Sequence, residues 1–294
     1  MIDNIRLLLL IGTLVVVGIM LGLWWLGIRN HNFSYVDIGW SVNFAVLAML
    51  YALLAPGYLP RRALIATMFT AHGLRLGWHL ARRIIGEPEE GRYQQLRKDW
   101  SVGGADPAGA GAHADAHGTA RAATGAATHV LNLKFLGFFE FQALLNAFLT
   151  LPLLIACFNP APQFHPLEIA GAALFLIAIV GESTADAQLA AFKRNPLAGE
   201  DGKGVCDVGL WRYSRHPNYF FEWLIWIAYA VFALASPHGW IALAMPVLML
   251  HFLINVTGLK ATEEQALRTK GERYRLYQAR TSGFVPWFPK RMEQ

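Results

Sequence analysis

Residues 7–28 read LLLLIGTLVVVGIMLGLWWLGI, an apolar run without a single charged side chain. A helix needs about 20 mostly apolar residues to cross the hydrocarbon core of a bilayer, so this run is long enough to form a membrane span. It is too long for the apolar region of a signal peptide, and no small-residue cleavage site follows before Arg29. The run therefore predicts a first transmembrane helix.

The composition of the whole chain supports this interpretation. Of its 294 residues 55% are hydrophobic and only 15% are charged, and the mean hydropathy is +0.34. Soluble domains carry about 25% charged residues, so this chain has too few charges to cover a globule. Two cysteines cannot build a disulfide scaffold. The net charge of +5 comes without a stripe of basic and aromatic residues, so we expect a membrane partner and no nucleic acid.

Further apolar segments follow along the chain. With the first they give seven predicted spans, at residues 7–28, 38–55, 63–84, 131–158, 167–183, 223–235 and 240–259. We therefore expect an all-α fold, in which residues 1–294 form a single integral membrane domain of about seven transmembrane helices. No obligatory protein partner is evident from the sequence.

The distribution of Lys and Arg predicts the orientation of these spans. If the N-terminus lies outside, 21 of the 25 basic residues lie inside, in segments 29–37, 82–134, 184–222 and 260–294. Arg6, Arg61 and Arg62 then lie outside. Cytoplasmic loops carry an excess of Lys and Arg. We predict an external N-terminus and a cytoplasmic C-terminus, with residues 260–294 as a cytoplasmic amphipathic segment.

Residues 101–129 differ from everything around them. They are mostly Ala and Gly with scattered His, Asp and Thr, and they lack hydrophobic periodicity. This composition predicts a disordered insert in the loop between the third and fourth spans. His113, Asp115, His117 and His129 could be imagined as metal ligands, but metal sites need ligands held in a fixed geometry. We predict no metal site.

The densest polar motif, GLWRYSRHPNYFFE at residues 209–222, precedes the sixth predicted span. Arginine side chains such as Arg212 and Arg215 suit phosphates, while Asn218 and Glu222 suit ribose hydroxyls or a carboxamide. The alternative is a charged loop that anchors a helix at the lipid headgroups, with Trp and Tyr as interfacial residues. We favour a ligand site because so many hydrogen-bonding types occur together.

The segment RHPNYF at 215–220, with Glu222 following, resembles the C-terminal signature of the membrane steroid 5-alpha-reductase superfamily. YVDIGW at 35–40, RLGWH at 75–79 and the pair Glu263-Glu264 extend the resemblance, which is strongest to its bacterial steroid 5-alpha-reductase-like branch (DUF1295). The resemblance implies a multi-pass enzyme of the bacterial inner membrane. It implies NADPH as cofactor and an activated C=C bond of a lipid or steroid-like substrate as the reduced group.

The resemblance also implies which residues bind NADPH. These are Asn218, Tyr219 and Glu222 near the nicotinamide, Arg215 and His216 in the same pocket, Asp186 and Arg194 at the adenosine and phosphate part, Arg82, Arg83 and Arg92 as phosphate-binding arginines, Lys203 at the 2′-phosphate, and Glu264 or Tyr277 folding over the cofactor. Other interpretations stay open. Asp186 could be a helix-end charge that reaches water, and Arg82 and Arg83 could be positive-inside anchors. The C-terminal segment could be a helix lying on the headgroups.

In the steroid reductases a glutamate on the second span and a tyrosine near the third span hold the substrate carbonyl. The predicted second span here, 38–55, has no carboxylate. The nearest substitutes are Asp37 at its mouth and Glu140 in the fourth span, with Tyr35 and Tyr93 as candidate acids.

Reducing the double bond needs a hydride, a proton and a donor to the enolate oxygen, and Tyr35 with Asp37 could supply that donor. Alternatively, Asp37 caps the second helix and Tyr35 lies at the interface. Glu140 is also a candidate partner for Arg75 within the bundle, because an unpaired charge there is costly.

Isoprenylcysteine and phospholipid N-methyltransferases of the same superfamily share the Arg-His-Pro-x-Tyr segment and the Glu-Glu pair. An S-adenosylmethionine-dependent lipid or isoprenoid methyltransferase is therefore the first alternative, and a non-catalytic lipid-binding membrane protein is the second. Asn218 after Pro217 and the predicted seven spans favour the reductase. A shared fold alone does not settle the chemistry.

Overall fold

The computed structural model describes residues 1–102, 117–194, 204–256 and 258–290. Within these ranges the chain is helical, and the only extended pairing is an isolated bridge between Ser214 and Ser282. The predicted all-α fold is confirmed. The chain divides into two compact units, Met1–Phe158 and Asn159–Gln294.

Several helical stretches are long and apolar enough to cross a membrane. They are Ile5–Asn30, Tyr35–Leu54, Thr128–Cys157, Pro166–Arg194 and Gly239–Val256. They match five of the seven predicted spans and make this a membrane protein. The other two predicted spans are helices of a different character: Leu59–Ile84 contains five arginines, and Pro217–Ala233 has only 17 residues. The count of seven and the orientation stay predictions.

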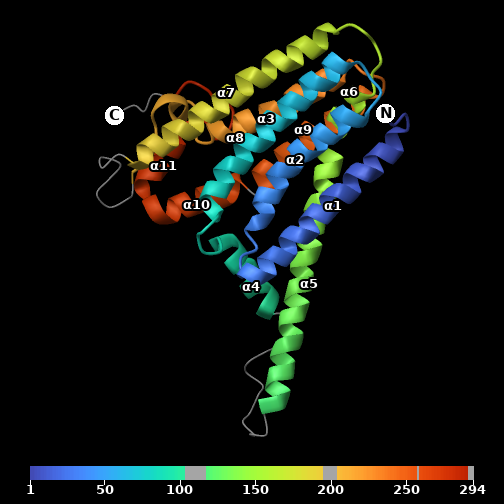
Figure 1. The fold of residues 1–294 in the computed structure, drawn as a ribbon. Coiled ribbons are helices and arrows are strands. Elements are labelled where there is room, and N and C mark those ends of the chain that lie inside the picture. Colours follow the sequence, from blue (N-terminus) through green and yellow to red (C-terminus); the bar gives the residue numbers. More distant parts are fainter. Residues whose placement is uncertain (103–116, 195–203, 257, 291–294) are drawn as a thin grey trace. The chain divides into compact units, whose positions relative to one another are not determined.

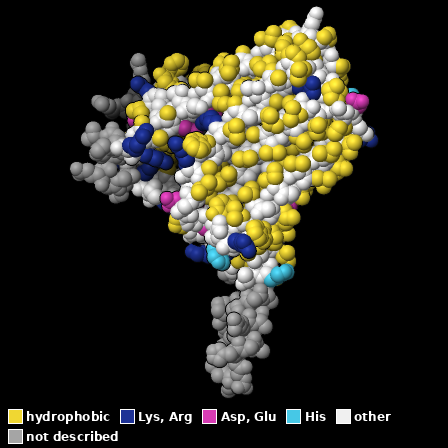
Figure 2. Space-filling view, viewed as in Figure 1, with side chains coloured by type: hydrophobic (Ala, Val, Ile, Leu, Met, Phe, Trp, Pro, Cys, Tyr) yellow, Lys and Arg dark blue, Asp and Glu magenta, His cyan; other side chains and the backbone are white. Residues whose placement is uncertain are grey.

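Apolar side chains cover the outer faces of the long helices. Leu14, Leu53 and Val180 are each more than half exposed, and Figure 2 shows apolar side chains over most of the visible helical surface. Soluble proteins rarely expose such large apolar areas. A lipid environment solvates these side chains, in agreement with the apolar spans.

The first unit contains helices α1 to α6. Their bounds are α1 Ile5–Asn30, α2 Tyr35–Leu54, α3 Leu59–Ile84, α4 Gly91–Val102, α5 His117–Leu149 and α6 Leu151–Cys157. Helix α2 packs against α1, α3 and α5 (Figure 1). A Cβ atom on Gly73 of α3 would lie 2.6 Å from the backbone oxygen of Ser41 on α2. Only glycine permits this approach, which is typical of helix packing in membranes.

The turn between α2 and α3 is closed by Arg62. Its Nη1 donates a 2.9 Å hydrogen bond to the carbonyl of Ala52 and a second hydrogen bond to that of Ala55. These carbonyls belong to the C-terminal end of α2, where a cation is favourable. Arg61 and Arg62, which we assigned to an external loop, are both buried.

Helix α5 extends into the stretch that we predicted to be disordered. It begins at His117, so residues 117–129 are helical. Alanine has the highest helix propensity, which explains why an Ala-rich segment without periodicity can be helical. Residues 103–116, with His113 and Asp115, lie outside the described residues.

Among its described residues, the second unit contains α7 to α11 and three short helices. Their bounds are α7 Pro166–Arg194, η2 Gly209–Arg212, α8 Pro217–Ala233, η3 Gly239–Leu243, α9 Ala244–His251, η4 Phe252–Val256, α10 Leu259–Lys270 and α11 Glu272–Arg280. Helices α7 and α8 pack against each other in antiparallel directions, because Gly171 meets Phe232 and Gly181 meets Phe221. The polar C-terminal segment forms two helices, since Gly271 between them has a φ of +56° that glycine adopts readily.

Candidate functional site

The first polar group lies where α2 begins. Helix α2 starts at Tyr35, before the predicted span, so that Asp37 lies in its first turn. The hydroxyl of Tyr93 on α4 donates a 2.7 Å hydrogen bond to Asp37 Oδ1, and the Arg92 guanidinium forms an ion pair with Asp37 Oδ2. Both Asp37 and Tyr93 are buried. The second helix therefore does carry a carboxylate, which corrects our interpretation of the sequence.

Tyr35 does not form the predicted pair with Asp37. Its hydroxyl accepts a 3.1 Å hydrogen bond from the side-chain amide of Asn30. Residues two apart on a helix point to different sides, which explains why Tyr35 and Asp37 do not meet. The phenol partner of Asp37 is Tyr93, the other candidate acid.

Further charged residues surround this pair. Arg83 Nε donates a 2.7 Å hydrogen bond to Glu90, and Glu90 also lies 3.5 Å from Arg92 Nε. The backbone N–H of Glu90 donates to Ser34 Oγ over 2.9 Å, which ties the segment before α4 to the start of α2. We call Asp37, Tyr93, Arg92, Glu90 and Arg83 the Asp37 cluster.

The predicted phosphate-binding arginines of the first unit therefore have partners within it. Arg83 and Arg92 pair with carboxylates of the Asp37 cluster. Arg82 is exposed and lies over the Trp78 ring, 4.5 Å from its centroid. This contact suits an interfacial anchor, the alternative given above for Arg82.

Burial favours the protonated form of Tyr93. Removal from water raises the pKa of the Tyr93 hydroxyl well above its ordinary value, and the nearby negative charge of Asp37 raises this pKa further. The phenol therefore keeps its proton at physiological pH. It remains a hydrogen-bond donor.

Glu140 lies on α5. Both of its carboxylate oxygens are buried and have no hydrogen-bond partner among the described residues. The predicted pairing with Arg75 is therefore not made through a hydrogen bond. The reason is positional, since a spacing in sequence does not fix which faces of two helices meet.

The second polar group lies where α7 ends and α8 begins. Asn218 Nδ2 on α8 is 3.4 Å from Asp186 Oδ1 on α7. One helical turn further along, carboxylate oxygens of Glu182 and Glu222 lie within 4.8 Å of each other. We call Glu182, Asp186, Asn218 and Glu222 the α7–α8 row. It brings together three residues that we predicted from two distant segments, and it adds Glu182, which we had not selected.

The α7–α8 row holds a buried acceptor whose hydrogen bond is not supplied by the described residues. Asn218 Oδ1 is buried and has no hydrogen-bond partner among the described residues. The Trp226 indole donates a 2.9 Å hydrogen bond to Glu222 Oε1 and so orients that carboxylate. Next to the row, the rings of His216 and Tyr219 stack with centroids 5.5 Å apart.

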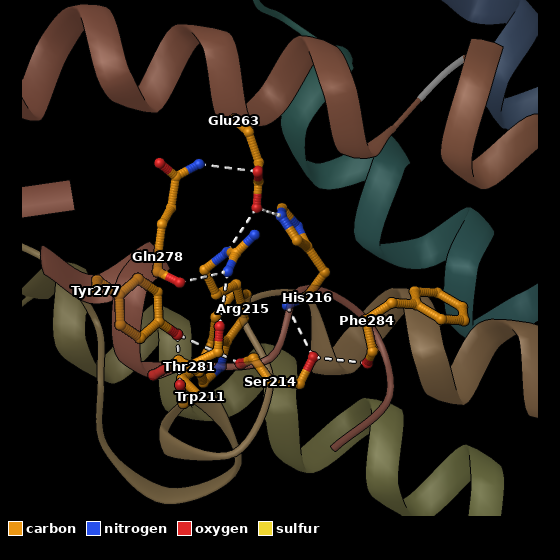
Figure 3. A network of polar contacts seen from close by, with 9 residues as sticks. All are labelled: Trp211, Ser214, Arg215, His216, Glu263, Tyr277, Gln278, Thr281 and Phe284. Atoms are coloured by element: carbon orange, nitrogen blue, oxygen red, sulfur yellow. Dashed lines mark hydrogen bonds and ion pairs between the residues drawn. The ribbon is translucent and has the colours of Figure 1, made fainter. Parts of the chain in front are cut away.

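The third polar group centres on Arg215 and Glu263 (Figure 3). Arg215 Nε donates a 2.7 Å hydrogen bond to Glu263 Oε1. Its Nη1 donates to the backbone carbonyls of Gln278 at 3.1 Å and Thr281 at 2.6 Å. His216 Nε2 lies 3.2 Å from the same oxygen of Glu263, and Gln278 Nε2 donates to the other oxygen at 2.9 Å. We call these five residues the Arg215 clamp.

The clamp keeps Glu263 ionised. Burial alone would raise the pKa of this carboxyl group, but hydrogen bonds with His216 and Arg215 and the positive charge of Arg215 outweigh burial and lower the pKa to about 2. The carboxylate is therefore charged throughout the physiological range.

Tyr277 on α11 also holds the loop before α8 in place. Its buried hydroxyl donates to the backbone carbonyl of Trp211 and lies 3.3 Å from that of Ser214. Ser214 Oγ in turn donates to the carbonyl of Phe284 over 2.8 Å. Tyr277 and Arg215, which we predicted to bind the cofactor, therefore hold the motif to α11 and the C-terminal tail.

Other predicted cofactor residues lie apart from these contacts. The Glu264 side chain is 68% exposed and lies 3.8 Å from Arg268. Its neighbour Glu263 is the member of the pair that enters the Arg215 clamp, and the pair in the sequence gave no means to choose between them. Arg194 is exposed at the end of α7, where Nε donates to the Ala190 carbonyl. Lys203 lies outside the described residues.

The fold and the polar groups define a multi-span helical membrane protein with polar clusters at the ends of its helices. The sequence matches the family described as "Protein of unknown function (DUF1295)" over residues 23–106 and 117–281, and the chain belongs to this family. The family predicted from the motifs is thereby confirmed. No curated protein and no solved structure matches the chain.

Proposed function

We propose that this protein is an NADPH-dependent oxidoreductase of the bacterial inner membrane that reduces an activated C=C bond of a lipid or steroid-like substrate. The observation that carries the proposal is the 2.7 Å contact between Tyr93 and Asp37. It puts a carboxylate of the second helix against a tyrosine that follows the third helix. The resemblance to the steroid 5-alpha-reductases implies this pair as the holder of a substrate carbonyl.

The pair suits the substrate half of the reaction. Negative charge develops on a carbonyl oxygen when the conjugated double bond is reduced, and a buried hydrogen-bond donor stabilises that charge. Tyr93 is protonated at physiological pH, and burial raises its pKa further. Its one O–H is donated to Asp37 in this structure, so it donates to the substrate oxygen when that oxygen replaces Asp37 as the acceptor. Asp37, held by Arg92, positions the phenol. We therefore assign Tyr93 as the catalytic residue and Asp37 as its positioning residue.

The α7–α8 row suits the nicotinamide end of NADPH, which supplies a hydride when it is bound. The unpaired acceptor Oδ1 of Asn218 matches the N–H groups of a carboxamide. The carboxylates of Asp186 and Glu222 match the hydroxyl donors of a ribose. Arg194, exposed at the end of α7, is available for a phosphate. Arg215 is not assigned to the cofactor, because the clamp engages it.

One observation favours the methyltransferase alternative. The α7–α8 row contains three carboxylates, Glu182, Asp186 and Glu222. Such a row attracts a cation, and S-adenosylmethionine carries a sulfonium and an ammonium group. The two cofactors therefore need to be compared on the same protein.

Thermal unfolding of the purified protein in detergent makes this comparison. A ligand at 100 times its Kd stabilises the folded state by about 2.7 kcal/mol, which raises Tm by several degrees. We expect this rise with NADPH and none with S-adenosylmethionine. The reverse result would establish the methyltransferase, and no response to either would favour a lipid-binding protein.

Variants assign the response to the α7–α8 row. Asn218→Ala and Glu222→Gln should abolish the NADPH shift while the protein still expresses and unfolds cooperatively. Asn255→Ala is the matched control, because Asn255 is an exposed amide outside the row, whose side chain lies 3.3 Å from the His251 ring. A shift that survives in Asn218→Ala would remove the row from the cofactor site.

A further inference from the structure

A cationic pocket lies on α11 and the C-terminal tail. Its lining residues are Arg273, Leu276, Tyr277, Arg280 and Lys290, and its volume is about 430 Å³. Ligand sites commonly measure roughly 300–1,000 Å³, so the pocket can hold a small polar group. Three of the lining residues are cations and none is a carboxylate. The pocket is therefore suited to an anion.

One wall of the pocket is fixed by an ion pair. Arg280 pairs with Asp207 just outside the lining. The backbone N–H of Lys290 donates a 2.9 Å hydrogen bond to the carbonyl of Arg280. The tail is thereby held beside α11, so that Lys290 reaches the same pocket as Arg273 and Arg280.

Large apolar side chains stand out beside these cations. Trp287 is 70% exposed and Phe288 is 77% exposed. Their backbone is nevertheless held in place, because the Trp287 N–H donates a 2.9 Å hydrogen bond to the Tyr213 carbonyl and the Phe288 ring meets the Tyr213 ring edge-on at 6.1 Å. Leu276, on the pocket wall, is also about half exposed. A fixed segment therefore presents two large rings to the surroundings.

We propose that this C-terminal face, formed by Arg273, Leu276, Arg280, Trp287, Phe288 and Lys290, binds the phosphate of an anionic phospholipid. The Arg273 guanidinium group and the Lys290 ammonium group attract the phosphate, while Arg280, paired with Asp207, fixes one wall of the pocket. Trp287 and Phe288 enter the interfacial layer of the bilayer, where aromatic rings are favoured. A soluble phosphate would use the cations but would leave both rings in water, so the apolar rings select a lipid.

This inference is independent of the proposed reaction. The face contains no residue of the Asp37 cluster or of the α7–α8 row. Loss of lipid binding would therefore leave the response to NADPH in place, and failure of the NADPH test would leave the lipid result unchanged. The two proposals fail separately.

The first experiment measures Tm of the full chain in a neutral detergent with added lipid. Phosphatidylglycerol should raise Tm, whereas phosphatidylcholine should raise it much less, because polybasic surfaces are attracted to anionic lipids. The double variant Arg273→Gln/Lys290→Gln should lose at least half of the phosphatidylglycerol shift. Arg268→Gln is the matched control, since Arg268 is exposed on α10 and does not line the pocket.

Defined outcomes overturn the proposal. Equal shifts with the two lipids, or an unchanged phosphatidylglycerol shift in the double variant, would show that the pocket does not bind an anionic lipid. A full shift with inorganic phosphate or pyrophosphate would make it a site for soluble anions instead.

A second experiment follows Trp287 directly. Phosphatidylglycerol brominated on its acyl chains quenches tryptophan fluorescence on contact. The difference in quenching between the wild type and Trp287→Phe gives the contribution of Trp287. This contribution should be larger with brominated phosphatidylglycerol than with brominated phosphatidylcholine. Trp240→Phe is the control, because Trp240 is 68% exposed on an apolar span and should respond equally to both lipids. No contribution from Trp287 would contradict insertion of the tail.

Discussion

The Asp37 cluster and the Arg215 clamp each centre on a carboxylate that meets an arginine, yet their other donors differ. Asp37 accepts the one O–H of a phenol, which can turn to a ligand oxygen when it leaves this carboxylate. Glu263 receives an amide and a guanidinium, and that guanidinium also bonds two backbone carbonyls. Because the donors to Glu263 are themselves held in place, this carboxylate links parts of the chain. A carboxylate paired with a phenol is suited to chemistry.

The largest effect is expected from Tyr93→Phe. Removing the phenolic hydroxyl should lower the rate of NADPH oxidation with an enone steroid or enone lipid by about 100- to 10,000-fold, the contribution of a positioned acid. The measurement is the NADPH absorbance over time.

Tyr35→Phe is the control for this variant, because its hydroxyl meets Asn30 and not Asp37. It should retain most of the activity. If the two variants lose activity equally, the contrast between the Asp37 cluster and the clamp disappears.

The next effect is on stability. Glu263→Gln should lower the free energy of unfolding by about 2–4 kcal/mol, because the partly buried charge of Arg215 loses its partner. Glu264→Gln should change it by less than about 0.5 kcal/mol, since its side chain is exposed. Thermal or denaturant unfolding in detergent gives both values. An equal loss in both variants would show that the clamp does not depend on its central carboxylate.

The pH dependence follows from the same carboxylate. The pKa of Glu263 is about 2 in the folded protein, against an ordinary value of 4.5. Its contribution to stability is therefore complete above pH 4.5 and is lost as the pH falls toward 2. Wild-type protein should lose stability across this window relative to Glu263→Gln. Parallel pH profiles of the two proteins would contradict the lowered pKa.

The smallest effect is expected at the edge of the Asp37 cluster. Arg83 pairs with Glu90, but the Arg83 side chain is half exposed. Arg83→Gln should change the free energy of unfolding by at most about 1 kcal/mol, as is usual for surface ion pairs. A larger loss of stability would show that Arg83 supports the Tyr93–Asp37 pair. The rate of NADPH oxidation should then fall in Arg83→Gln as well.

Sequence patterns predicted the helices better than their ends. An apolar run of span length forms a helix whatever surrounds it, which is why the predicted spans recur as helices. Asp37 was placed outside the second span because a charge interrupts the apolar run. The structure keeps it in the helix, because Tyr93 and Arg92 satisfy its carboxylate. The sequence cannot show such partners before the fold is known.

The candidate site was predictable in part for a similar reason. Asn218 and Glu222 could be chosen from residue type, and Asp186 through the resemblance to the reductases, and they do gather on α7 and α8. The role of Arg215 could not be predicted, because its partners include backbone carbonyls of Gln278 and Thr281. Every residue has a backbone carbonyl, so the sequence does not show which carbonyls will accept these hydrogen bonds. An arginine that binds phosphate and one that fastens a tail look the same in the motif.

The hydrogen bonds of Arg62 to the end of α2 bear on how the protein is assembled. Its guanidinium group finds its acceptors at Ala52 and Ala55, which belong to the preceding helix. If α3 entered the bilayer alone, it would carry this charge without those carbonyls. The two helices should therefore enter together as a hairpin, with the arginine already hydrogen-bonded to its neighbour.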